Sequence, residues 1–249
     1  MGSNLFVKLL IVVFCTVVCI EAFASEALVG AVKKGDLSEV KKLLKSDHDP
    51  NSKDVKGDPA LYLALVGRHI DIAKLLITKG ADANSTNQFG APILHTAAGS
   101  GDTDIVKLLI SKGADVNAGF ERYENITALM LAAQDGHKDV VNVLISKKAD
   151  VNARTKSGDT ALIAATAKGH IDIAKTLLRK GADINVVSDS GYSALFIAIS
   201  EVNEEMVSFL LSHDADPNIK DKNGDTALSF AKRIKDPVII EQIKEAGGK

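Results

Sequence analysis

The stretch TALIAATAKGHIDIAKTLLRKGADIN, residues 160–185, decides the fold of this chain. Thr160 is a good N-cap for a short alanine-rich helix, which ends in a turn at Gly169. The next segment predicts a second helix that stops at Gly181, because its apolar residues recur at helical spacing, at Ile171, Ala174, Leu177 and Leu178. One such helix pair cannot bury its apolar face alone, so we expect copies of it to stack.

The same unit recurs along the chain at a nearly constant period. The motif Asp-x-Asn ends at asparagines spaced 33, 33, 35, 33 and 33 residues apart: Asn51, Asn84, Asn117, Asn152, Asn185 and Asn218. A leucine ladder has the same spacings, at Leu61, Leu94, Leu129, Leu162, Leu195 and Leu228. An alanine follows each leucine by three residues. Several ladders with one period indicate a solenoid of repeats.

The chain resembles the ankyrin repeat family in the segments GADANSTNQFGAPILHTAA (80–98), GADVN (113–117), GDTALIAATAKGHIDIAKTLLRKGADINVVSDSGYSAL (158–195) and GDTALSFA (224–231). The resemblance implies an all-α solenoid of about seven stacked helix pairs joined by β-hairpin-like fingers. The predicted boundaries are 25–53 for an N-terminal cap, 54–86, 87–119, 120–154, 155–187 and 188–220 for repeats, and 221–249 for a C-terminal cap.

Some positions depart from the family pattern. Arg68 and Val202 replace the glycine of the turn between two helices. Valine is poor wherever φ must be positive, so we expect the turn at Val202 to be either rearranged or strained.

The first 24 residues differ from the rest. Lys8 precedes an apolar run over residues 9–20, and Ala22 and Ala24 form a small-x-small pattern. This predicts a signal peptide that is cleaved after Ala24, and an exported, periplasmic or secreted protein without a membrane segment. The alternative is an uncleaved anchor that makes the chain a membrane-tethered spacer. Both cysteines lie in this segment, so the mature chain would have no disulfide and no thiolate site.

Composition and motifs give no catalytic signature. The net charge of −2 offers no electrostatic case for nucleic acid. Most of the six histidines follow the repeat, and no metal-binding or nucleotide-binding motif is present. We therefore expect no catalytic residue, no metal and no cofactor, although an enzyme built on the repeat scaffold stays an alternative. Asn125 is the one candidate for a glycan, because Asn84 belongs to the repeat motif and its side chain should bond the turn.

Function is therefore expected in the surfaces of a monomer that binds a protein partner. The resemblance implies that finger tips and the exposed side of the first helices contact this partner. The finger that holds Phe120 and Tyr123 is two residues longer than the others. Either its aromatic residues reach into the binding groove, or they fold back onto the neighbouring finger. Interface hot spots favour aromatic residues and arginine. The candidate contact residues are Phe89, Phe120, Arg122, Tyr123, Gln134, Asp135, Lys156 and Tyr192.

Overall fold

The computed structural model describes residues 25–249, so the predicted signal peptide lies outside the described residues. Residues 25–34 are helical. The elements that follow are α2 (Leu37–Lys45), α3 (Ala60–Val66), α4 (Ile70–Thr78), α5 (Ile93–Gly99), α6 (Thr103–Ser111), β1 (Gly119–Phe120), β2 (Ile126–Thr127), α7 (Ala128–Gln134), α8 (Lys138–Ser146), α9 (Ala161–Ala167), α10 (Ile171–Arg179), α11 (Ala194–Ser200), α12 (Glu204–Leu211), α13 (Ala227–Ile234) and α14 (Pro237–Glu245). The prediction of a mostly helical chain is confirmed.

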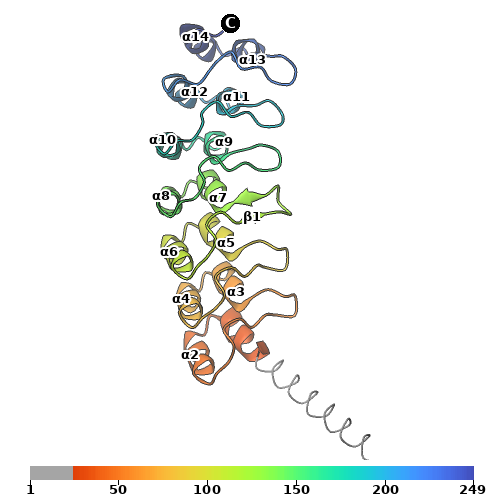
Figure 1. Cartoon of the computed structure of the whole chain (residues 1–249), viewed down its shortest axis with the longest axis vertical. Coiled ribbons are helices and arrows are strands. Elements are labelled where there is room, and N and C mark those ends of the chain that lie inside the picture. The colour runs from red at the N-terminus through yellow and green to blue at the C-terminus, as the bar shows by residue number, and fades with distance from the viewer. Residues whose placement is uncertain (1–24) are drawn as a thin grey trace, which may run out of the picture. The chain divides into compact units, whose positions relative to one another are not determined.

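The chain divides into two compact units. Unit 1 consists of the described part of Met1–Thr96 together with Ser111–Ala114, and unit 2 consists of Ala97–Ile110 and Asp115–Lys249. In unit 1, α3 packs against α4, and α2 also packs against α4. In unit 2 the first helices form one series, in which α7 packs on α9, α9 on α11, and α11 on α13. These first helices lie between the fingers and the second helices of their unit (Figure 1).

The two apolar ladders form the core. The alanines Ala64, Ala97, Ala132, Ala165, Ala198 and Ala231 are all fully buried. The six leucines of the ladder are at most 7% exposed: Leu61, Leu94, Leu129, Leu162, Leu195 and Leu228. Alanine has no side-chain bulk beyond Cβ, so it lets neighbouring helices approach closely, and the leucine fills the space beside it. The prediction from residues 160–185 is also confirmed in detail, because the Thr160 hydroxyl accepts a hydrogen bond from the backbone N–H of Ile163.

The repeated Asp-x-Asn motif joins successive repeats by hydrogen bonds. The Asp150 carboxylate accepts from the backbone N–H of Asn152, which closes a local turn. The Asn152 side chain then reaches the next repeat: Nδ2 donates to Gly181 O at 2.9 Å, and Oδ1 accepts from the Asp183 N–H at 2.9 Å. Asn84 likewise donates to Gly113 O at 2.9 Å, which confirms the role predicted for its side chain.

Two turns in every repeat require a left-handed backbone. The turn between paired helices has φ between +52° and +80° at Gly35, Arg68, Gly101, Gly136, Gly169, Val202 and Lys235. The turn after the second helix has φ between +58° and +97° at Asp47, Gly80, Gly113, Lys148, Gly181, Asp214 and Gly247. Val202 therefore keeps the shape of the turn and is strained, with φ +52°, rather than rearranged.

The fingers differ in their backbone pairing. In the long finger, β1 and β2 form an antiparallel pair with Gly119 opposite Thr127 and Phe120 opposite Ile126. Two fingers of unit 1 have a single bridge each, between Lys53 and Pro59 and between Thr86 and Pro92. Within residues 25–249, no helix combines the length and the apolar character needed to cross a membrane.

Candidate functional site

The repeated turn histidines have structural partners. In unit 2, His137 Nε2 lies 2.8 Å from Gly99 O, and His170 Nε2 lies 3.0 Å from Gln134 O. A carbonyl oxygen can only accept, so Nε2 carries the proton in both rings. In unit 1 the His69 ring lies against Gly35 so closely that a Cβ added to Gly35 would be 2.6 Å from His69 Cε1. Each of these three histidines therefore contacts the repeat before its own.

The long finger of residues 119–127 is the most distinctive feature of unit 2. Its tip turns twice, because Tyr123 N–H and Asn125 N–H both donate to Phe120 O, at 2.9 and 3.0 Å. Glu124 and Asn125 have positive φ, at +55° and +61°. The Asn125 side chain packs against Gly119, where an added Cβ would lie only 2.6 Å from its Cγ. The finger is thus fixed by its own backbone and by the contact between the half-buried residues Asn125 and Gly119.

Phe120 and Tyr123 stack on each other within this finger. Their ring centroids are 5.5 Å apart and the ring planes differ by 18°. Phe120 is half-buried, whereas Tyr123 is 69% exposed. The aromatic residues therefore pair inside the finger, and one ring face stays open to solvent. A large exposed aromatic side chain held by a rigid support is the kind of group that dominates protein interfaces.

Lys156, in the tip of the next finger, contacts the long finger directly. Its backbone N–H donates to Glu124 O at 2.7 Å, and its Nζ donates to Glu121 O at 3.0 Å. Arg122 lies between Glu121 and Glu124 in the sequence, and its side chain is exposed. The structure therefore brings four predicted contact residues together: Phe120, Arg122, Tyr123 and Lys156.

The other four predicted residues lie elsewhere. Phe89 is at a finger tip of unit 1, 51% exposed. Gln134 is the last residue of α7 and Asp135 is its C-cap. Gln134 is half-buried and Asp135 is exposed. Tyr192 belongs to a second aromatic cluster and is half-buried.

This second cluster joins three rings from two successive repeats. Tyr192 stacks on Phe196 of α11 at 5.8 Å, and Phe230 of α13 lies 5.7 Å from Phe196 and 6.4 Å from Tyr192. The Arg233 guanidinium lies 4.8 Å above the Phe230 ring, and its Nη1 is 2.6 Å from the Asp225 carboxylate. Of these three aromatic residues, only Tyr192 was among the contact residues predicted from the sequence. Phe196 and Phe230 occupy adjacent positions of consecutive repeats, which is the signal that could have revealed the cluster.

The first helices of unit 2 also share a partly exposed stripe. Positions at i, i+3 spacing face the same side of each helix and are half-buried or exposed, and the exposed charged residues Asp135, Lys168 and Glu201 follow directly after three of these helices. The stripe carries no charge until the last repeat: Leu131, Gln134, Ala164, Ala167, Ile197, Ser200 and Phe230, followed by Arg233. An uncharged surface of this kind can be desolvated by a partner at low cost.

Two aspartates hold their charge by local contacts. In unit 1, the hydrogen bond from Lys33 Nζ at 2.8 Å is the main cause that lowers the pKa of Asp54, with backbone N–H donors of Lys56 and Asp58 adding to it and outweighing burial. In unit 2, burial tends to raise the pKa of Asp221, but the amide donors around it and Arg233 lower it overall. Both carboxylates close finger turns, so their role is structural.

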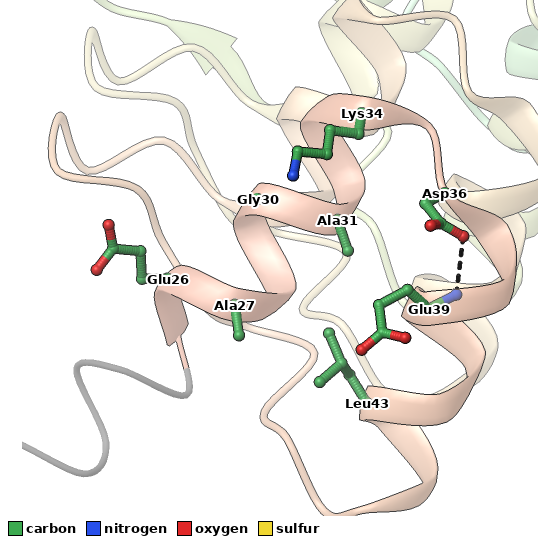
Figure 2. A pocket seen from close by; sticks show the side chains of 8 residues that line it. All are labelled: Glu26, Ala27, Gly30, Ala31, Lys34, Asp36, Glu39 and Leu43. Carbon is green, nitrogen blue, oxygen red and sulfur yellow. Dashed lines mark hydrogen bonds between the residues drawn. The ribbon is translucent and has the colours of Figure 1, made fainter.

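A pocket lies between the helix of residues 25–34 and α2 (Figure 2). Ala27 and Ala31 of the first helix and Glu39 and Leu43 of α2 point into the space between them (Figure 2). The Asp36 carboxylate beside it accepts from the Glu39 N–H at 2.9 Å and so caps α2. Its lining holds the charged residues Glu26, Lys34, Asp36 and Glu39, but no histidine and no hydroxyl-bearing side chain. Within residues 25–249, no three histidine, cysteine or acidic side chains gather as a metal site would require.

Comparison with known families gives one result. The model for ankyrin repeats in three copies matches residues 28–120, 117–188 and 183–240. A search of the curated proteins found no match.

Proposed function

Because this chain belongs to the ankyrin repeat family, we propose that it is a non-catalytic module that binds a protein partner through finger tips and the exposed face of its first helices. Ankyrin repeats are generally protein–protein interaction modules. The stacked helices supply a rigid frame, and side chains at exposed positions carry the recognition.

The observation that carries this proposal is the aromatic pair on the long finger, in which Tyr123 is exposed and Phe120 is half-buried. Tyr123 is 69% exposed although it is large and apolar, and the repeat core does not use it. Its ring stacks on Phe120 within the same finger, with the ring centroids 5.5 Å apart. The shape of the finger is set in advance by backbone hydrogen bonds, so a partner would not have to order it on binding.

We also propose that the protein is exported to a periplasmic or extracellular site. The support is the apolar run of residues 9–20 and the alanines at 22 and 24. Sequencing the N-terminus of protein recovered from cells tests this, because cleavage after Ala24 leaves Ser25 first. An intact N-terminus on the cellular protein would instead favour the membrane-tethered spacer.

The binding proposal is tested by quantitative affinity capture with residues 25–249 as bait. Phe120→Ala combined with Tyr123→Ala removes the aromatic pair, and Val238→Ala is the matched control, because Val238 is a 44% exposed apolar residue on α14. A true partner is captured by the wild type and by Val238→Ala, and is lost with the double variant. Capture profiles that are identical for all three baits would contradict the proposal.

A further inference from the structure

The insertion in the long finger creates a backbone group that the other fingers lack. Two pairs of successive fingers in unit 2 share one backbone rung each, as when the Asp189 N–H donates to Ser157 O at 2.7 Å. The rung from Lys156 N–H to Glu124 O, also 2.7 Å, is the same contact one repeat earlier. Two extra residues place another carbonyl, that of Glu121, beside the neighbouring finger. Lys156 Nζ donates to this carbonyl at 3.0 Å.

We propose that Lys156 is the positioning residue of the long finger, rather than a residue that contacts the partner. Its backbone N–H and its ammonium group hold carbonyls on both sides of Arg122 and Tyr123. The tip is thereby fixed at two points three residues apart. This inference rests on the proposed function, because a fixed tip lowers the entropic cost of presenting Tyr123 to a partner.

The contact of a lysine ammonium group with a carbonyl of the preceding finger is specific to Lys156 and the long finger. The equivalent tip positions in the other fingers hold Val55, Gln88, Tyr123, Asp189 and Lys222. Lys222 is the chemical match for Lys156, and it is exposed. In the part of the chain that the structure describes, no hydrogen bond from Lys222 Nζ to a neighbouring finger is found. Lysine at this position therefore forms the clamp only where the longer finger offers the extra carbonyl.

Tryptic cleavage after Arg122 tests the clamp without a partner. Arg122 is exposed at the tip, and a protease cuts there only when the turn opens locally. Lys156→Met keeps the backbone rung and most of the side-chain stem but removes the ammonium donor. Loss of this solvent-exposed, charge-assisted hydrogen bond should raise the rate of cleavage at Arg122–Tyr123 roughly tenfold. Lys156→Arg restores a cationic donor and should return the rate toward that of the wild type.

Two controls separate a local effect from general destabilisation. Lys222→Met should leave cleavage at Arg122 unchanged, and cleavage after Lys222 should stay at the wild-type rate in Lys156→Met. Equal cleavage at Arg122 in the wild type and Lys156→Met would overturn the inference, as would faster cleavage at both sites in Lys156→Met. Because this assay needs no partner, failure of the capture experiment above would leave the clamp intact and count only against the proposed function.

Discussion

Replacing Lys148 by glycine should stabilise the protein, although glycine usually destabilises a folded chain. Lys148 has φ +69° in the turn after α8, where Gly80, Gly113 and Gly181 stand in other repeats. The side chain is exposed. A Cβ at any of those three glycines would meet no atom within 4 Å. Removal of the lysine side chain should therefore cost little packing.

The size of the gain follows from two opposing terms. A left-handed backbone costs an L-residue about 1–2 kcal/mol, and glycine escapes that cost. Glycine also makes the unfolded chain more flexible, which costs about 0.4–1 kcal/mol. The difference is a stabilisation of about 0.5–1 kcal/mol. The hydrogen bond from Asn117 Nδ2 to Lys148 O at 3.3 Å involves only the backbone of residue 148, so the substitution can keep it.

Urea unfolding of the wild type and Lys148→Gly, followed by far-UV circular dichroism, measures the change. Lys147 is the matched control, because it precedes Lys148 and has φ −98° and ψ 19°. Glycine at 147 gains no relief of strain and should destabilise the protein by about 0.5 kcal/mol. Opposite shifts of the two midpoints support the assigned backbone. Destabilisation by both substitutions would refute the reasoning.

Other substitutions test other parts of the structure. Leu162→Ala should lower the free energy of unfolding by about 2–5 kcal/mol, because Leu162 is only 1% exposed. Hydrogen exchange should show that protection is lost first around residues 125–190. Unchanged protection there would argue against the place of Leu162 between repeats. Asn152→Ala removes both bonds to the next repeat and should cost about 1–2 kcal/mol in thermal unfolding, whereas no change would mean that water replaces them fully. The lowered pKa of Asp54 means that its ion pair stabilises the fold above the usual aspartate pKa of about 3.9, and that this stability is lost as pH falls through the lower pKa of the folded state. Asp54→Asn should therefore flatten the decline of stability in acid, and an unaltered acid limb would show that the pair with Lys33 contributes nothing.

The repeat period made most of the fold predictable. Leu162 and Ala165 are buried for the same reason in every repeat, so their recurrence predicts the stacking directly. The prediction of the turns was less complete. Arg68 and Val202 drew attention because they replace a glycine, but Lys235 and Lys148 also have positive φ and were missed. A lysine side chain gives no sign of backbone conformation, and only its equivalence with a glycine in another repeat reveals the strain.

The candidate site was less predictable than the fold, for a physical reason. The insertion and its aromatic residues are visible in the sequence, so Phe120 and Tyr123 could be selected. The role of Lys156 could not be predicted from the sequence, because its ammonium group binds the backbone carbonyl of Glu121, and every residue has such a carbonyl. The contact of Tyr192 with Phe230 joins residues of successive repeats and depends on how the repeats stack.

The central claim is that Phe120 and Tyr123, the aromatic pair on the long finger, bind a protein partner. The most direct test is a titration of the captured partner against the wild type and against Phe120→Ala with Tyr123→Ala, with a thermal melt of each protein. If the pair is a binding hot spot, the double substitution should weaken binding by at least about 2 kcal/mol, which is roughly thirtyfold in Kd. The protein should stay folded, with a loss of about 0.5–1.5 kcal/mol from the ring stack and a further loss from the half-buried Phe120 side chain. A double variant that melts far earlier yet binds with unchanged affinity would show that the finger serves the fold and that recognition lies elsewhere.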